Sequence, residues 1–73
     1  MQLVMTYSAV RELEQVVSQD TLQIIRDAIS NLTDDPRPPG SSRFEKMDGC
    51  YYLIIDNYYV FYHIDDDNTV NVL

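Results

Sequence analysis

The stretch CYYLIIDNYYVFYHI, residues 50–64, decides the fold of this chain. Its apolar residues follow the period of two that is typical of β-strands. The polar pair Asp56-Asn57 divides the stretch, and both residues tolerate the positive φ angles that a two-residue type I′ turn requires. The stretch therefore predicts a β-hairpin in which Leu53 faces Val60.

Both faces of this hairpin are apolar in the predicted register. Successive residues of a strand point to opposite sides, so facing pairs alternate between the two faces. One face carries the pairs Tyr51–Tyr62, Leu53–Val60 and Ile55–Tyr58. The other face carries the pairs Tyr52–Phe61 and Ile54–Tyr59.

A strand and two amphipathic helices are predicted ahead of the hairpin. Residues 2–7 predict the strand, and Ser8 is expected to cap a helix running to about residue 17, because its hydroxyl can accept a backbone N–H of the first turn. Ser18 or Asp20 is expected to cap the second helix. Apolar residues recur at helical spacing in both, at Val10, Leu13 and Val17 and then at Leu22, Ile25, Ile29 and Leu32.

A proline-rich connector, TDDPRPPGSS, occupies residues 33–42. Its three prolines end the second helix and prevent regular structure, so it is expected to be stiff rather than flexible. Arg37 within it is expected to pair with Asp34 or Asp35. Such an exposed ion pair contributes less than about 1 kcal/mol.

Shorter signals complete the predicted sheet. Residues 43–47 predict a short strand, and Asp48-Gly49 predicts the turn before the hairpin. Residues 65–68 are expected to form a solvated turn, because a calcium loop would need a glycine and a distant glutamate that are missing. Residues 69–73 predict the last strand.

The resulting order of elements is β-α-α-β-β-β-β in one domain, residues 1–73. The helical hairpin spans about 8–32, and the sheet comprises 43–73 together with the strand at 2–7. Short turns predict an antiparallel sheet with both helices on one face, an α+β architecture. The helices can cover only one face of the sheet, so the face that carries Tyr52, Ile54, Tyr59 and Phe61 must meet a partner or stay exposed.

The charge of the chain restricts its partners. Five Lys and Arg against twelve Asp and Glu give a net charge of −7, which opposes direct binding to nucleic acid or an anionic membrane. No apolar run is long enough to span a membrane, and the N-terminus lacks the features of a signal peptide, so a soluble cytoplasmic protein is expected. Cys50 stands alone and is expected to be a buried apolar residue; neither a metal nor a cofactor is expected.

The chain resembles the RelE/ParE family of type II toxin-antitoxin toxins, including plasmid-stabilisation proteins. The likeness rests on the order of elements, on Ser8-Ala9 and Leu13-Glu14, on DDPRPPGSSRF at residues 34–44, and on residues 49–67. The last stretch includes the pattern Tyr58-x-Val60-x-Tyr62. The resemblance implies the fold of that family, an antitoxin partner, and a possible activity as a ribosome-dependent endoribonuclease.

The departures from the family pattern bear on activity. In the mRNA-cleaving members, basic residues alternate along the hairpin and hold RNA phosphates; the matching positions here are Tyr52, Ile54 and Tyr59, none of which is charged. The family's further Arg and its Tyr or His on a C-terminal segment would lie beyond Leu73. The resemblance therefore implies an inactive or attenuated ribonuclease.

Three hypotheses remain open at this stage. In the first, the chain is an interaction domain that binds an antitoxin-like protein or a second copy through Tyr52, Ile54, Tyr59 and Phe61. In the second, it is an active ribosome-dependent mRNA interferase whose catalytic site is rearranged around His63, Arg43 and Lys46; a histidine pKa near 6.5 suits a general base. In the third, it is an acidic module that binds a basic protein.

Overall fold

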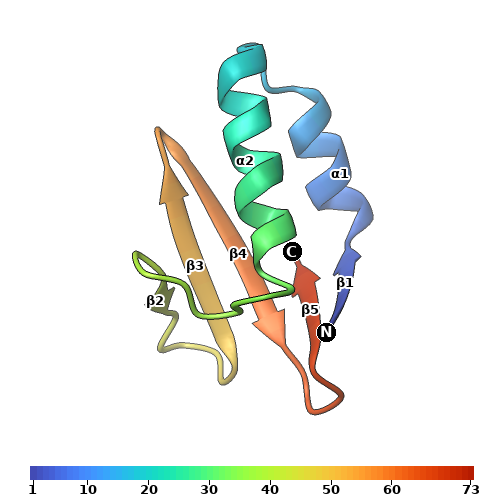
Figure 1. Ribbon diagram of the computed structural model, residues 1–73, viewed down its shortest axis with the longest axis vertical. Helices are drawn as coiled ribbons and strands as arrows, with labels where there is room; N and C mark the ends of the chain where they lie inside the picture. Colours follow the sequence, from blue (N-terminus) through green and yellow to red (C-terminus); the bar gives the residue numbers. More distant parts are fainter.

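The computed structural model describes residues 1–73 and contains two helices and five strands (Figure 1). The predicted order and the α+β class are confirmed. In chain order the elements are β1 (Gln2–Met5), α1 (Tyr7–Glu14), α2 (Gln19–Asn31), β2 (Ser42–Arg43), β3 (Cys50–Ile55), β4 (Tyr58–Ile64) and β5 (Thr69–Val72).

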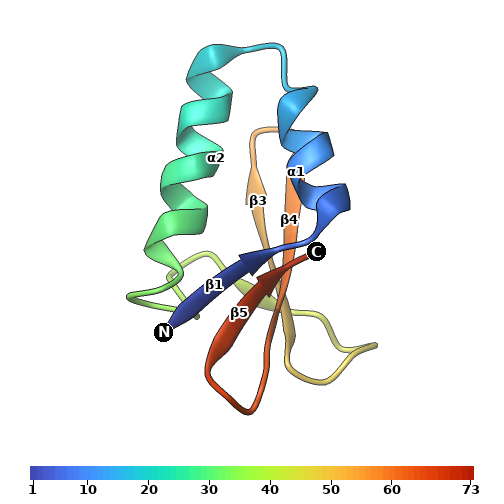
Figure 2. The ribbon, with the colours of Figure 1, turned by 90° about the vertical axis from the view of Figure 1, so that its right-hand side faces the viewer.

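The strands form one mixed sheet in the order β1-β5-β4-β3-β2. Strands β2, β3, β4 and β5 pair with one another in antiparallel fashion, as predicted. The prediction of a wholly antiparallel sheet is wrong for β1, which pairs in parallel with β5 and brings Leu3 opposite Val70. Figure 2 shows these two strands side by side and pointing the same way. Short turns impose an antiparallel direction, and no short turn joins β1 to its neighbour.

The β3–β4 hairpin has the predicted register, with Leu53 opposite Val60 and Ile54 opposite Tyr59. Its loop is the predicted pair, but only Asp56 has a positive φ, 52°. The prediction of a type I′ turn is therefore wrong, because that turn needs positive φ at both central residues. The hydroxyl of Thr21 donates a hydrogen bond to the Asp56 carboxylate at 3.1 Å, which ties the hairpin tip to α2.

The helix caps match the prediction in α2 and differ in α1. Ser18 caps α2, its hydroxyl accepting the Thr21 N–H at 3.2 Å. In α1 the cap is Thr6, whose hydroxyl accepts the Ala9 N–H at 3.1 Å, so the prediction of Ser8 is wrong. The Thr6 N–H donates to the Val72 carbonyl at 2.9 Å and continues the strand up to the cap. Helix α1 ends at Glu14, earlier than predicted.

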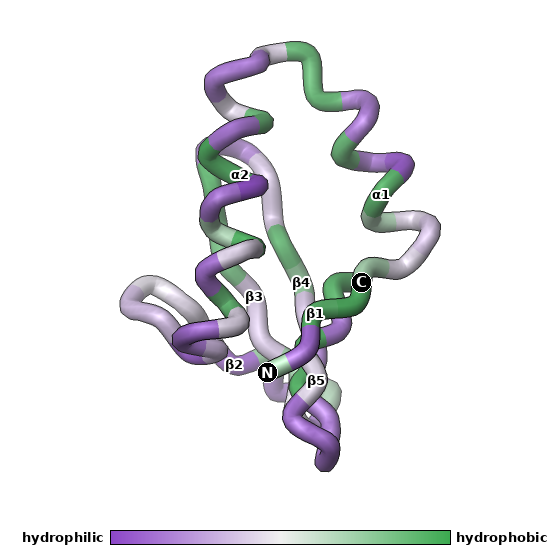
Figure 3. Tube along the Cα trace, turned by 45° about the vertical axis from the view of Figure 1, so that its right-hand side comes forward, coloured by the Kyte–Doolittle hydropathy of each residue, from purple (hydrophilic) through white to green (hydrophobic).

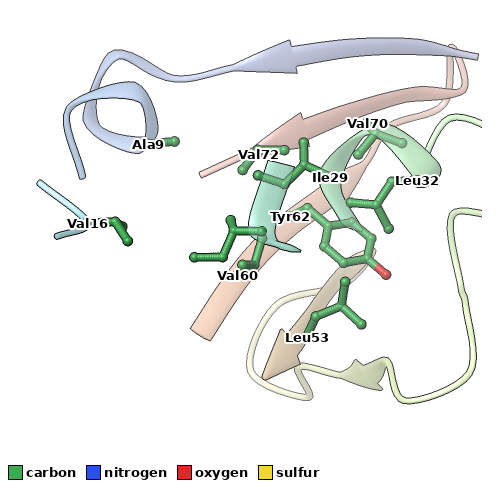
Figure 4. Close-up of a cluster of buried hydrophobic side chains, with 10 residues drawn as sticks. Ala9, Val16, Ile29, Leu32, Leu53, Val60, Tyr62, Val70 and Val72 are labelled. Atoms are coloured by element: carbon green, nitrogen blue, oxygen red, sulfur yellow. The ribbon is translucent and has the colours of Figure 1, made fainter. Parts of the chain in front are cut away.

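The hydrophobic core lies between the sheet and the helices (Figure 4). It comprises Ala9, Val16, Ile25, Ile29, Leu32, Leu53, Val60, Tyr62, Val70 and Val72. Tyr62 is fully buried, and its hydroxyl donates to the Pro36 carbonyl at 2.7 Å. Burial also raises the pKa of Tyr62. Through its hydrogen bond to Pro36, this tyrosine holds the proline-rich connector against the core.

Two local predictions on the connector side of the sheet are wrong. Arg37 forms no ion pair with Asp34 or Asp35; its backbone N–H instead donates to the Asp35 carboxylate at 3.2 Å. The predicted strand at 43–47 is reduced to β2, because the chain turns back after Phe44, whose N–H donates to the Cys50 carbonyl at 2.8 Å. Cys50 is buried as predicted, and desolvation raises the pKa of its thiol.

Candidate functional site

The site begins with the alternation of side chains along β3 and β4. Leu53 on β3 and Val60 and Tyr62 on β4 belong to the core. The residues directly before and after Leu53 and Val60 therefore point to the opposite face of the sheet. The structure thereby places the four predicted binding residues together on that face: Tyr52 and Ile54 on β3, Tyr59 and Phe61 on β4. Their role in binding stays a prediction.

The rings on this face pack against one another. The ring centroids of Tyr52 and Phe61 are 5.5 Å apart, and those of Tyr52 and Tyr59 are 5.8 Å apart. Tyr59 and Phe61 stack with centroids 6.0 Å apart. Aromatic pairs at such separations stabilise one another by about 0.5–1.5 kcal/mol beyond the burial of their area. The three rings therefore form one packed cluster on the surface of the sheet.

Phe44 also belongs to this group. Its ring meets the edge of Phe61 in a T-shaped arrangement with centroids 5.5 Å apart. Sequence reasoning placed Phe44 in a short strand and assigned it no role. Ser42 faces Tyr52, and Phe44 shares the side of Ser42 because every second residue of a strand points the same way; the sequence alone does not determine this pairing of β2 with β3. We call Phe44, Tyr52, Ile54, Tyr59 and Phe61 the aromatic face.

Much of the aromatic face is open to water. Ile54 is 55% exposed and Tyr59 is 60% exposed, while the other three side chains are half-buried. None of the five is charged, and the hydroxyl groups of Tyr52 and Tyr59 make no hydrogen bond within the chain. An apolar surface with free hydroxyl groups can both exclude water and form directed hydrogen bonds to a partner.

The three residues of the rearranged-site hypothesis do not all lie on one side of the sheet. His63 lies on the same side of the sheet as the aromatic face, two residues after Phe61. Arg43 faces Tyr51, so its side chain belongs to the other side, and it makes an ion pair with Asp48 at 3.7 Å. Lys46 is exposed in the turn between β2 and β3. The chemistry of this hypothesis would need all three around one reacting group.

Gly49 creates the space beside His63. Its φ is +74°, and a Cβ added there would lie 3.1 Å from the Nε2 atom of His63 and 3.1 Å from the Ile64 carbonyl oxygen. The Ile64 N–H donates to the Gly49 carbonyl at 2.9 Å, which holds the turn against β4. His63 is therefore packed against backbone and half-buried.

Asp65 serves the turn that follows β4. Its carboxylate accepts the N–H groups of Asp67 and Thr69, both at 3.0 Å, and the side-chain amide of Asn71 at 3.3 Å. Its pKa is lowered, first by the hydrogen bond from Thr69 and then by those from Asn71 and Asp67, with a smaller contribution from His63. No group of three His, Cys, Asp or Glu side chains is arranged to hold a metal ion.

A small apolar pocket of about 60 Å³ lies between the two helices and the adjoining ends of β4 and β5. Leu13, Val16, Ile25 and Val60 are among its lining residues, and Glu12 is the one charged residue in its wall. The pocket could hold an apolar side chain, but it does not contain the acid, base and cation that cleavage of RNA requires. The aromatic face is the stronger candidate site.

The family of the chain follows from its sequence. Residues 3–73 match the family described as ParE toxin of type II toxin-antitoxin system, parDE. The chain belongs to this ParE toxin family. No curated protein is significantly similar to it in sequence. No helix in the structure is long and apolar enough to span a membrane.

Two solved structures share the fold of this ParE-family chain. The chain superposes on a free mutant of the E. coli toxin RelE with a TM-score of 0.77 and 18% identity, covering 97% of this chain and 76% of that one. The intact E. coli RelBE toxin-antitoxin complex contains a chain that matches with a TM-score of 0.81 and 18% identity, covering 97% of this chain and 88% of that one. At this identity the likeness establishes the fold alone.

The chemistry available to this ParE-family chain differs between binding and cleavage. Cleavage of RNA by its 2′-hydroxyl needs a proton acceptor, a proton donor and cations at the phosphate oxygens. Beside the aromatic face, β4 carries the one histidine of the chain, His63, and the face itself holds no cation. Binding to a protein needs only what the face already has, which is a packed apolar centre and free hydroxyl groups.

Proposed function

We propose that this ParE-family protein acts as a protein-binding domain of a type II toxin-antitoxin system, without mRNA-cleaving activity. The observation that carries the proposal is the exposed, uncharged aromatic face. Contact between apolar side chains and water is unfavourable, so covering this face with a partner would lower the free energy of the system.

The partner that we propose is an antitoxin-like protein, whose segment would lie on the aromatic face. The E. coli RelBE structure is described as a toxin-antitoxin complex, so a chain of this fold can assemble with an antitoxin. Ile54 and Tyr59 are the most exposed members of the face and would lose the most water on binding. Tyrosine is enriched among residues that dominate interface energies.

The absence of ribonuclease activity rests on the missing cations. Each loss of about 1.4 kcal/mol in transition-state stabilisation slows a reaction tenfold. An active phosphodiesterase needs several such contributions from charged groups, and Arg43 lies on the other side of the sheet. In this view the protein has the fold of its family and binds an antitoxin-like partner, but it does not cleave RNA.

The binding arm of the proposal is tested with the product of the neighbouring reading frame. We expect the purified chain to bind that product, and the double variant Ile54→Ser/Tyr59→Ser to weaken the affinity by roughly tenfold or more in calorimetry. Val17→Ser is the matched control, because Val17 is 92% exposed, lies in the loop that joins α1 to α2, and is not part of the aromatic face. Equal affinities for the wild type and the double variant would overturn the proposed binding face.

The catalytic arm uses a purified translation system with a defined mRNA. We expect no ribosome-dependent cleavage by the wild-type chain, and no growth arrest when it is overexpressed. Cleavage that His63→Ala abolishes would replace the proposal with the rearranged catalytic site. Cleavage that survives His63→Ala would overturn the inactivity as well and move the search to other residues.

A further inference from the structure

The surroundings of the aromatic face are acidic at both ends of the hairpin that carries it. Asp56 lies at the β3–β4 loop, and Asp65, Asp66 and Asp67 lie in the β4–β5 turn. Figure 3 shows this turn as a hydrophilic end of the sheet. The face itself is uncharged, so these aspartates carry the nearest negative charges along the β3–β4 hairpin and its two ends.

Two carboxylates of the β4–β5 turn are free. Asp65 is engaged by the hydrogen bonds of the turn, whereas Asp66 and Asp67 are exposed and their carboxylates accept no hydrogen bond. The single ion pair of the chain joins Arg43 to Asp48, so neither carboxylate has a cation within the chain. Asp66 and Asp67 therefore present unpaired negative charge at this end of the hairpin.

We infer that the segment occupying the aromatic face is apolar in its centre and carries Lys or Arg at the end that meets the β4–β5 turn. This inference rests on the proposed function and specifies the chemistry of its partner. Apolar burial over the five side chains would supply most of the affinity, while complementary charge at the rim would raise the association rate and set the orientation.

The same charges argue against the other occupants. A second copy would bring another net charge of −7 and a second set of unpaired carboxylates to the interface. An acidic protein segment and RNA would meet the same repulsion, because neither supplies cations to the two free aspartates. A basic, apolar segment is the one occupant that both the centre and the end of the surface favour.

A displayed library of random peptides of about sixteen residues tests this chemistry without knowledge of the natural partner. The library is selected on the wild-type chain and depleted on the Ile54→Ser/Tyr59→Ser variant, so that the peptides retained depend on the aromatic face. We expect them to have an apolar centre and a net positive charge. Retained peptides that are neutral or acidic would overturn the inference and leave the proposed binding face intact.

The retained peptides are then synthesised and measured against charge variants. We expect Asp66→Asn/Asp67→Asn to weaken binding about 3- to 10-fold at low salt, and to flatten its dependence on salt. Glu12→Gln/Glu14→Gln is the matched control, because it removes the same charge from α1, and it should change the affinity less than about twofold. Equal effects of the two double variants would overturn the inferred orientation.

Two further outcomes separate this inference from the proposed function. If no peptide depends on Ile54 and Tyr59, the binding face itself is wrong. If the chain self-associates with increasing concentration, and Ile54→Ser/Tyr59→Ser prevents this, the occupant is a second copy and the inferred basic segment is wrong. Sedimentation velocity distinguishes these cases.

Discussion

The ionised carboxylate of Asp65 stabilises the β4–β5 turn, so the stability of the fold should depend on pH. Its carboxylate accepts two backbone N–H groups and the amide of Asn71, and these bonds favour the ionised form. The pKa of the group is therefore lower in the folded chain than in the unfolded chain. A group of this kind stabilises the fold above its unfolded pKa, and that stabilisation is lost as the pH falls through the folded pKa.

We expect Asp65→Asn to be less stable than the wild type at about pH 7, and the difference to shrink as the pH falls below about 4. Urea unfolding at a series of pH values measures the difference in the free energy of unfolding. Asp66→Asn is the control for the charge change, because that carboxylate accepts no hydrogen bond. A difference for Asp65→Asn that stays constant from about pH 7 to about pH 3 would contradict the role of the ionised carboxylate.

At the scale of elements, the start of α1 shows how a neighbouring strand selects a cap. Thr6 and Ser8 both carry hydroxyl groups suited to capping, and local pattern favoured Ser8. The Thr6 N–H bonds to the Val72 carbonyl of β5, which keeps Thr6 extended with a ψ of 158°. An extended residue directly before a helix has the geometry of a cap, so the helix begins at Tyr7 and Ser8 lies in its first turn.

We expect Thr6→Ala to lower the free energy of unfolding by about 1 kcal/mol, because the Ala9 N–H loses its acceptor. Ser8→Ala should change it by less than about 0.5 kcal/mol, because the Ser8 side chain makes no hydrogen bond to the helix backbone. Chemical denaturation followed by circular dichroism measures both variants. A larger effect of Ser8→Ala would show that the cap lies at Ser8 in solution.

At the scale of the whole molecule, the two ends of the chain meet in the sheet. β1 and β5 pair in parallel although nearly the full length of the chain separates them, whereas a two-residue loop joins β3 to β4. Closing a long loop costs more conformational entropy than closing a short one. The β3–β4 hairpin, which carries most of the aromatic face, can therefore form before the sheet is complete.

We expect this order of formation to appear in folding kinetics. Val60→Ala on β4 should give a φ-value above roughly 0.5, and Leu3→Ala on β1 a φ-value below roughly 0.3. Val60 is buried and Leu3 packs against the core, so both variants remove apolar contacts. Stopped-flow refolding and unfolding in denaturant supply the rates. A higher φ-value at Leu3 than at Val60 would mean that β1 is already paired with β5 in the transition state.

The candidate site was largely predictable, since strand alternation alone placed Tyr52, Ile54, Tyr59 and Phe61 on one face. Phe44 was missed because its contact with Phe61 depends on how the chain turns back after β2. The separation of Arg43 from His63 was missed for a similar reason: the register between β2 and β3 assigns Arg43 to the side of Tyr51. Both errors concern a short strand whose position depends on distant partners.

Local pattern in the chain was sufficient for the element order and the hairpin register, predicted the burial of Cys50, and limited the cap of α2 to Ser18 or Asp20. The first two depend on residues that are close in sequence, whose spacing and chemistry leave one favourable arrangement. The parallel direction of β1, the cap at Thr6, the turn at Asp56 and the place of Phe44 depended on the tertiary structure. In each case the deciding contact comes from a distant segment, because a backbone or side chain with several local options takes the one that its distant neighbour stabilises.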